Sequence, residues 1–366
     1  MARKLKSDKL LFLATLLLIC VSIIMVYSAS AAVAFDRYGQ ASTFLVKQVM
    51  WLVLGLALFA VVMRVDYRTY REPVFIWTGL GVVCLALIAV LFSPPINNVR
   101  RWFGFAGIGV QPSELAKLVA IVFTAALLER RMHRIDDIKY ALMPIGLVVM
   151  GLVGLILLEP DFGTSMALLL VAAVMVFAAG LNYRYILGVI LVGAPAIYIL
   201  VMGTAYRRQR VLSFLDPWRD PLGAGFQIIQ SLIAVGTGGI WGKGLGNGVQ
   251  KLFYLPEPHT DFIYAVISEE LGLVGATLVL LCFCTVTWRG MRIALRAPDP
   301  FGAFLALGLT TMVAAQAFFN ISVVLGLLPT KGIPLPLVSA GGSSLLVNLI
   351  GMGILLNVSQ HASSEA

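Results

Sequence analysis

The chain has 366 residues, of which 60% are hydrophobic and 12% are charged, and its mean hydropathy is +0.93. Soluble domains carry about 25% charged residues, so this composition excludes an ordinary soluble enzyme and indicates a polytopic membrane protein. The formal net charge is +9, but the basic residues are spread over several connecting segments, which argues against a nucleic-acid partner. The four cysteines lie in apolar runs and lack metal-ligand spacing, so a zinc site or a disulfide framework is not expected.

Ten apolar runs approach the length of about 20 residues that a membrane-spanning helix needs. In chain order, they cover residues 10–28, 45–63, 74–92, 113–129, 141–158, 164–180, 185–203, 262–285, 302–325 and 341–358. The sequence therefore predicts an all-α polytopic membrane protein, with residues 1–366 forming a single integral membrane domain. A long loop, about residues 204–261, connects the seventh and eighth predicted spans.

Lys and Arg are distributed unevenly over the connecting segments. With the N-terminus inside, the cytoplasmic segments hold fifteen of these residues and the short outer loops hold five. Because cytoplasmic loops are enriched in Lys and Arg, we expect both termini in the cytoplasm and the long loop on the outer side. The outer connections also contain more Pro and Gly than the inner ones, and irregular backbone at membrane depth is tolerated where it lines a wet cavity.

The segment Tyr254–Gly272 carries the most informative charges. Asp261 and His259 precede an apolar helix, and Glu269 and Glu270 lie within it. A carboxylate near the bilayer centre costs roughly 2.5–3.5 kcal/mol, so such groups usually have a partner or a task. On one continuous helix Glu269 is about 12 Å from Asp261 and could support a site, whereas Glu270 points away and suits an ion pair. Simple capping of the helix by Asp261 is an equally good explanation.

Glu114 and Lys117 lie three residues apart at the start of the fourth predicted span, a spacing that permits an ion pair within one helix. In one interpretation, Lys117 faces a phosphate and Glu114 orients the lysine side chain. In the other, this is an ordinary helix start whose lysine reaches toward water. Arg101 and Lys331 are cations of the short outer loops, and Arg in particular suits bidentate phosphate recognition. For Glu159, after the fifth span, a cap and turn is at least as good an explanation as a contact with substrate.

Several motifs follow one another in order over nearly the whole chain: Asn98–Phe103, Gln111–Lys117, Glu159–Thr164, Arg210–Pro217, Gly246–Lys251, Tyr254–Ile263, and Asn320 through Gly341–Ser344. Together they resemble one family, the FtsW/RodA/SpoVE (SEDS) proteins of bacterial cell-wall synthesis. The stretch Leu328–Gly332 is more similar to the cell-division branch than to the elongation branch, whereas Ala340 stands where the family usually has Tyr.

This resemblance implies a peptidoglycan glycosyltransferase that polymerises lipid II at the outer face of the bacterial cytoplasmic (inner) membrane, in septal synthesis during cell division. It also implies undecaprenyl-diphosphate-linked glycan as a ligand, a class B penicillin-binding protein transpeptidase and other divisome membrane proteins as partners, and Mg²⁺ or Mn²⁺ as a helper. The family's essential acid corresponds to Asp261, as general base or metal ligand. We expect substrate contacts from Arg101, Glu114, Lys117, His259, Lys331 and Ser339, with Glu269 and Glu159 in support.

The main alternative is a transporter that flips lipid II across the bilayer. Transporters place charged groups near the membrane midplane, often on broken helices in matched halves. The fifth to seventh predicted spans lack ionisable residues in their interiors, and the irregular segments lie on one side only. A passive scaffold would leave the acids and outer cations without a purpose, so an enzyme is the favoured interpretation.

Overall fold

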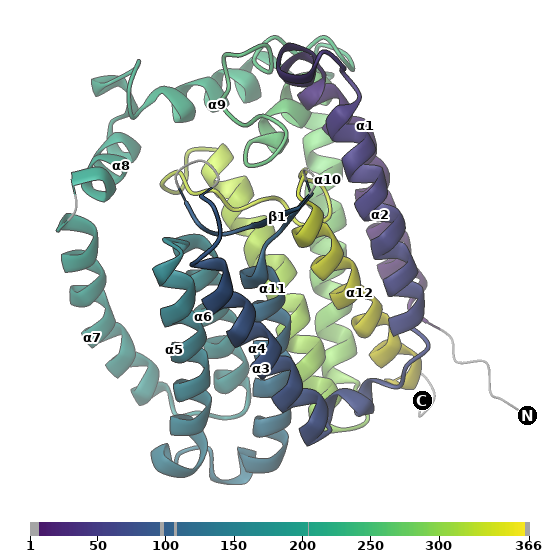
Figure 1. Cartoon of the computed structure of the whole chain (residues 1–366), viewed down its shortest axis with the longest axis vertical. Coiled ribbons are helices and arrows are strands. Elements are labelled where there is room, and N and C mark those ends of the chain that lie inside the picture. The colour runs from purple at the N-terminus through teal and green to yellow at the C-terminus, as the bar shows by residue number, and fades with distance from the viewer. Residues whose placement is uncertain (1–6, 96–98, 106–107, 204, 363–366) are drawn as a thin grey trace, which may run out of the picture.

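The computed structural model describes residues 7–95, 99–105, 108–203 and 205–362, so the first residue of the Asn98–Phe103 motif lies outside the described part. Helices dominate the fold (Figure 1). The α-helices are α1 (Lys9–Tyr38), α2 (Thr43–Val62), α3 (Pro73–Val90), α4 (Pro112–Arg131), α5 (Met143–Leu158), α6 (Phe162–Ala178), α7 (Tyr183–Met202), α8 (Ala205–Leu215), α9 (Phe226–Thr237), α10 (Ile263–Leu295), α11 (Pro300–Val324) and α12 (Gly342–Ala362). Short helical turns cover Tyr67–Arg71, Met132–Arg134, Ile138–Leu142 and Pro217–Arg219, and β1 (Phe103–Phe105) pairs antiparallel with β2 (Ile108–Val110).

The all-α membrane architecture predicted from the sequence is confirmed, although the count of ten spans is not. Each predicted span falls on one helix, namely α1–α7 and α10–α12. Within the described residues, seven helices are long and apolar enough to cross a membrane: α1, α2, α3, α5 with its preceding turn, α10, α11 and α12. Helix α6 has 17 residues and is shorter than a typical span.

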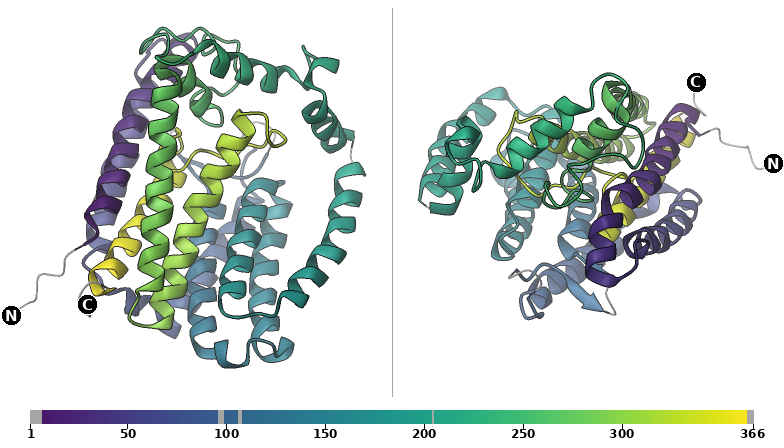
Figure 2. Two further views of the ribbon diagram at one scale, coloured as in Figure 1. Left: turned by 180° about the vertical axis from the view of Figure 1, so that it is seen from behind. Right: turned by 90° about the horizontal axis from the view of Figure 1, so that it is seen from above.

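Helix α11 forms the centre of the bundle and packs against α4, α6, α10 and α12. The most apolar windows of α11 and α12 are each 78% buried, against 22% for α2. Helix α7 stands away from the bundle in both orientations (Figures 1 and 2), and its main described contact is with α8.

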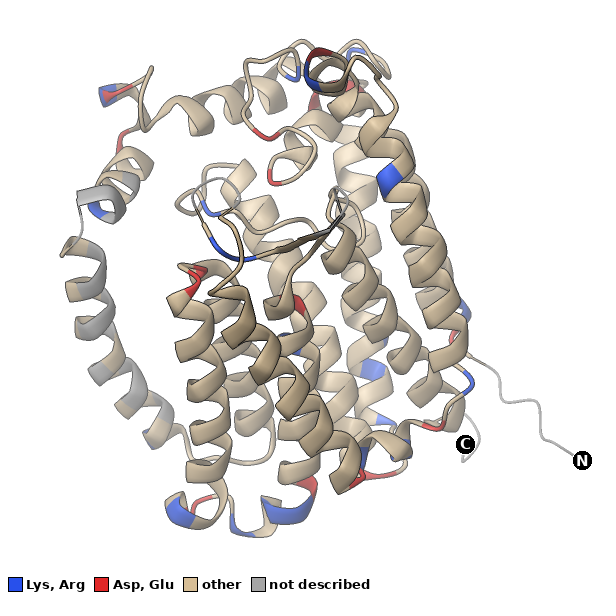
Figure 3. Cartoon of the chain, in the orientation of Figure 1, with Lys and Arg blue, Asp and Glu red and all other residues tan. Residues whose placement is uncertain are grey.

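The two ends of the described chain meet at one end of the bundle. The backbone N–H of Asp8 donates a hydrogen bond to Ser359 Oγ at 3.1 Å, and the Asp8 carboxylate pairs with Arg289, whose Nε lies 2.7 Å away. Lys and Arg gather at this same end (Figure 3). The two ends of the described chain and many basic residues thus lie at one end of the bundle, and the cytoplasmic location of that end stays a prediction.

The predicted span 262–285 falls on α10, but this helix is interrupted at Gly272 rather than continuous. This glycine has a φ of 66°, a left-handed conformation that favours glycine. The Tyr264 hydroxyl donates a hydrogen bond to the Ala276 carbonyl at 3.1 Å, although a straight helix would hold residues twelve apart at about 18 Å. The chain therefore turns sharply at Gly272, and the short segment Ile263–Leu271 lies beside the longer helix that follows.

At the end of the bundle opposite the termini, irregular segments cover the helix ends (Figure 1). The apolar stretch within the long loop forms α9, which packs against α10 and α11. Ser231 on α9 donates a hydrogen bond to the Val324 carbonyl at 2.7 Å and fixes this helix to the end of α11. Four segments meet here: the β1–β2 hairpin, the α5–α6 turn, the loop before α10 and the loop before α12.

Candidate active site

Asp261 lies where the loop before α10 meets the loop before α12. Asn320 on α11 joins these loops, because its side-chain amide donates to the Asp261 carbonyl at 2.7 Å and to the Ile333 carbonyl at 2.8 Å. A Cβ atom added to Gly332 would lie 2.9 Å from Asp261 Oδ2, so the carboxylate rests against a position that only glycine leaves open. The backbone and one face of this carboxylate are therefore fixed by neighbouring segments.

A second set of contacts joins the same two loops one residue earlier. Ser339 Oγ donates to the Thr260 carbonyl at 2.5 Å and accepts from the Leu335 N–H at 2.8 Å. The Ala340 N–H donates to the His259 carbonyl at 2.9 Å. The structure thus gives Ser339 a role in holding Asp261's loop in place, and its expected substrate contact stays a prediction.

His259 is buried against Phe44, with 4.5 Å between the two ring centroids. Burial lowers the pKa of His259 because the charged imidazolium loses hydration, so the ring is neutral near pH 7. Its Nδ1 has no hydrogen-bond partner among the described residues. A neutral imidazole with a free ring nitrogen is suited to hydrogen bonding with a ligand, which keeps the predicted substrate contact open.

Asp161 connects the α5–α6 turn to the same region. Its carboxylate accepts hydrogen bonds from Gln111 Nε2 at 3.0 Å and from the Thr164 N–H at 3.1 Å and hydroxyl at 2.8 Å. Gly163, in the first turn of α6, packs so closely on Ile333 that an added Cβ would lie 2.9 Å from Ile333 Cγ1. The Gln111–Lys117 and Glu159–Thr164 motifs, which lie far from Asp261 in the chain, are thereby connected to the loop before α12 that touches Asp261.

Glu159 is fully buried, and neither carboxylate oxygen has a hydrogen-bond partner among the described residues. Burial, with a smaller contribution from the Asp161 charge, raises the pKa of Glu159 to about 8, while Arg101 opposes the shift. The Arg101 guanidinium donates instead to main-chain carbonyls, from Nε to Glu159 at 2.8 Å and from Nη2 to Pro160 at 2.5 Å. Arg101 therefore closes the C-terminal end of α5, next to a carboxyl group that is largely protonated at neutral pH.

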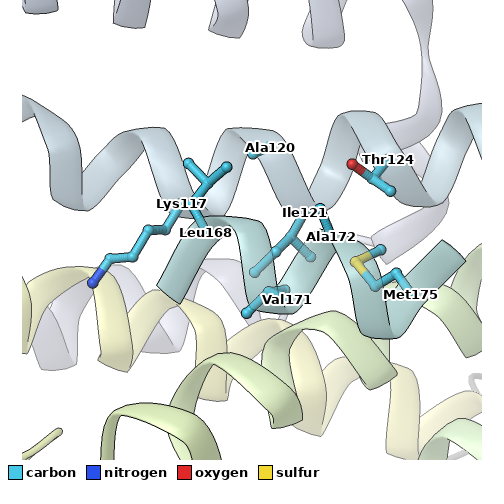
Figure 4. A pocket seen from close by; sticks show the side chains of 8 residues that line it. All are labelled: Lys117, Ala120, Ile121, Thr124, Leu168, Val171, Ala172 and Met175. Carbon is cyan, nitrogen blue, oxygen red and sulfur yellow. The ribbon is translucent and has the colours of Figure 1, made fainter. Parts of the chain in front are cut away.

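Glu114 and Lys117 form the predicted intrahelical ion pair, with 2.9 Å between Oε1 and Nζ. Both side chains are buried, with 4% and 2% of their surfaces exposed. Lys117 also borders a cavity of about 10 Å³ between α4 and α6, and Figure 4 shows its Nζ directed away from the other lining side chains. A cavity of this size holds about one water molecule. The expected diphosphate contact by Lys117 stays a prediction and would require this region to open.

Lys331 is the predicted cation most closely tied to Asp261, because it directly precedes Gly332. It is half-buried, and its Nζ contacts the sulfur of Met166 on α6. Burial lowers the pKa of Lys331, since the ammonium group loses hydration. An incoming anion would restore favourable contacts to this ammonium.

Glu269 and Glu270 both bind the long loop. Glu269 pairs with Lys243 Nζ at 2.7 Å and accepts from the backbone N–H groups of Val249 and Gln250 at 3.0 and 3.1 Å. Glu270 pairs with Lys251 Nζ at 2.6 Å. Glu270 also accepts from the Gly246 N–H at 3.0 Å and from the Ser28 hydroxyl on α1.

Sequence reasoning missed the lysine partners of these two acids. The Gly246–Lys251 motif could have indicated them, since its first and last residues, Gly246 and Lys251, both contact Glu270. The contacts show that Glu269 and Glu270 anchor the loop that leads to Asp261. Support of the site by Glu269 thus stays a prediction, with anchoring of the loop as its physical basis.

Together, the fold and this cluster define a multi-pass helical membrane protein with a polar site at the end of the bundle opposite the termini. The family model of the FtsW, RodA and SpoVE cell cycle proteins matches residues 8–364, and the chain belongs to this family. It is 45% identical to the probable peptidoglycan glycosyltransferase FtsW of Geobacter metallireducens, over 97% of this chain and 95% of that one. It is 43% identical to the stage V sporulation protein E of Bacillus subtilis, over 98% and 99%.

Solved structures agree with this assignment. One similar chain comes from work on the coordination of polymerization and crosslinking by a peptidoglycan synthase complex; its TM-score is 0.79 and its identity 33%, covering 98% of this chain and 99% of that one. The rod shape determining protein RodA of Thermus thermophilus has a TM-score of 0.72 and 28% identity, covering 97% of both chains. The predicted family is thereby confirmed.

Proposed function

We propose that this protein is a peptidoglycan glycosyltransferase that polymerises lipid II at the outer face of the cytoplasmic membrane, in septal synthesis during cell division. The observation that carries the proposal is the placement of Asp261 where the loops before α10 and α12 meet: Asn320 and Ser339 join these loops, and Gly332 lies against the carboxylate. The relatives named as probable peptidoglycan glycosyltransferases support the reaction class, since they match this chain over nearly its whole length.

The reaction joins two lipid-linked sugars. A hydroxyl oxygen of the acceptor sugar attacks the anomeric carbon of the growing glycan, and the bond from that carbon to the lipid diphosphate breaks. The diphosphate leaves with the bonding electrons, and the hydroxyl proton passes to the Asp261 carboxylate, which acts as general base. General base catalysis of this kind supplies about 10²–10⁴-fold in rate.

Cations close to the leaving diphosphate stabilise the charge that develops on it. Lys331 is best placed for this role, because it is bonded to Gly332, which touches Asp261. Arg101 already donates to a main-chain carbonyl at the end of α5, and Lys117 is already paired with Glu114. These two residues would therefore have to rearrange their present contacts before binding the diphosphate.

Asp261 is alternatively a ligand for a divalent cation. Within the described ranges, no group of three or more His, Cys, Asp or Glu side chains could hold a metal ion. Mg²⁺ is commonly held by one or two carboxylates together with substrate phosphates, and Asp261 fits that shared arrangement. Bound there, Mg²⁺ or Mn²⁺ would neutralise charge on the diphosphate.

The proposed setting is the bacterial inner membrane with both termini in the cytoplasm, which the gathering of Lys and Arg at the terminal end supports. A class B penicillin-binding protein is the proposed transpeptidase partner. Its support is the similarity to a chain from work on a peptidoglycan synthase complex that coordinates polymerization and crosslinking. Other divisome membrane proteins are proposed as further partners, because the proposed septal role places the protein among them.

The direct test incubates purified full-length protein with labelled lipid II, with and without a co-purified transpeptidase, and separates the products by length. The proposal predicts glycan chains. A parallel experiment uses liposomes with lipid II confined to the inner leaflet. If lipid II is translocated and no polymer forms in these two assays, the protein is a transporter rather than an enzyme.

A further inference from the structure

A cavity of about 300 Å³ lies between the α8–α9 part of the long loop, the end of the same loop at Pro256, and the loop before α12. Its polar lining comes from Gln209 on α8, Gln227 at the start of α9, and Thr330, and its apolar lining from Leu222, Phe226 and Pro256. This volume is at the lower end of the range of small-ligand pockets, about 300–1,000 Å³, so it suits one compact group rather than a long chain.

The cavity adjoins the candidate catalytic acid. Thr330 lies two residues before Gly332, a distance of at most about 7 Å along an extended chain, and Gly332 touches the Asp261 carboxylate. Pro256 precedes Asp261 by five residues in the same loop. A group bound in the cavity would therefore lie within reach of a reaction at Asp261.

The wall formed by the long loop is firmly built. The Asp220 carboxylate accepts hydrogen bonds from the N–H groups of Gly223 and Ala224 at 3.1 and 3.0 Å, and an added Cβ on Gly225 would lie 2.0 Å from the Pro217 carbonyl. This turn leads directly into α9, which Ser231 fixes to the end of α11. The side chain of Gln227 therefore starts from a fixed backbone.

The lining distinguishes among the parts of a lipid-linked glycan. None of the described residues that line it is charged, so they offer no counter-charge to a diphosphate or to the carboxylates of a peptide stem. The primary amides of Gln209 and Gln227 both donate and accept hydrogen bonds, which matches sugar hydroxyl and acetamido groups. Phe226, Leu222 and Pro256 offer apolar surface for the C–H face of a sugar ring.

We propose that this cavity is a saccharide subsite, which holds one N-acetylated sugar ring of the reacting glycan beside Asp261. The inference rests on the proposed function and adds a division of labour to it. Gln209 and Gln227 recognise sugar, whereas Lys331 recognises the diphosphate.

The test uses the full-length protein and two probes that separate these ligands. One is a soluble N-acetylglucosamine–N-acetylmuramic acid oligosaccharide without lipid or diphosphate, and the other is inorganic pyrophosphate. Gln209→Ala and Gln227→Ala are compared with Gln40→Ala, which removes an exposed glutamine distant in sequence from the cavity. Binding of each probe is followed by ligand-observed NMR, alongside kcat and KM for lipid II.

In both cavity variants we expect oligosaccharide binding to weaken and the KM for lipid II to rise, each about three- to tenfold, while pyrophosphate binding and kcat stay unchanged. Gln40→Ala should behave as wild type. Unchanged KM and oligosaccharide binding in both variants, with a wild type that polymerises lipid II, would overturn the subsite and leave the enzyme assignment intact. If the wild type forms no polymer, the proposed function fails, and glutamine-dependent oligosaccharide binding would then still support a saccharide site.

Discussion

Gly332 and Asp261 touch across two loops, and a Cβ on Gly332 would lie 2.9 Å from Asp261 Oδ2. We expect Gly332→Ala to displace the carboxylate while leaving the bundle intact. Because misplacement of a catalytic group by 1 Å costs about 10²-fold in rate, kcat for lipid II polymerisation should fall by about that factor. Gly341→Ala is the control, since its added Cβ would make an ordinary 3.7 Å contact with Ser344. Equal activity of the two variants would show that the contact has no catalytic effect.

The buried Glu114–Lys117 pair predicts a stability effect that is separate from any effect on substrate. Removing one partner of a buried pair leaves the other charge uncompensated, at a cost of about 3–5 kcal/mol. Lys117→Ala should therefore unfold at a clearly lower temperature in detergent than the wild type.

The double variant Glu114→Gln, Lys117→Met removes both charges and should recover most of that stability. If it also regains polymerase activity, Lys117 is a structural cation rather than a diphosphate ligand. A stable but inactive double variant would support the predicted contact with substrate.

Glu269 and Glu270 bind different parts of the long loop, so their variants should loosen different amides. Glu269→Ala removes the acceptor of the Val249 and Gln250 N–H groups, whereas Glu270→Ala removes that of Gly246. Loss of a hydrogen bond to a charged group costs about 1.5–3 kcal/mol, which corresponds to about 10–150-fold faster hydrogen exchange. Mass spectrometry of peptides from residues 243–251 should show this exchange pattern. Identical patterns in the two variants would contradict the assignment of separate partners.

The Glu159 carboxyl predicts a pH dependence of stability. Its folded-state pKa, about 8, lies above the ordinary glutamate value of 4.5, so the folded protein holds a proton that the unfolded chain releases. This contribution to stability is fully present below about pH 4.5 and is lost as the pH rises through about 8. Glu159→Gln should flatten the pH dependence of the thermal unfolding temperature over this window. A wild-type profile in the variant would show that Glu159 is already ionised in the folded state.

Hydrophobic run length and basic-residue placement predicted the helical membrane fold, because both patterns are set by the bilayer and can be read locally. The turn at Gly272 was not predictable in this way. It depends on close packing against the loop 239–244, where an added Cβ on Gly272 would lie 2.3 Å from the Gly242 backbone nitrogen. No local pattern in the apolar run 262–285 reports such a contact between distant backbone segments.

In the candidate site, too, local sequence patterns were predictive and contacts between distant segments were not. The scarcity of charge singled out Asp261, Glu114 with Lys117, and the Glu269–Glu270 pair, since ionised groups in an apolar chain are costly. The way in which Asn320, Ser339 and Asp161 join the loops could not be anticipated, because each acts through main-chain or side-chain partners that only the fold brings together. Short polar residues in the motifs gave no sign of which partner each would find.

The central claim is that the Asp261 carboxylate carries the chemistry. Its most direct test compares purified wild type and Asp261→Asn in a lipid II polymerisation assay, with thermal unfolding measured on the same samples. We predict that the variant inserts and unfolds like the wild type but loses glycan synthesis by at least about 10²-fold. Near-normal chain formation by a folded Asp261→Asn protein would contradict this account.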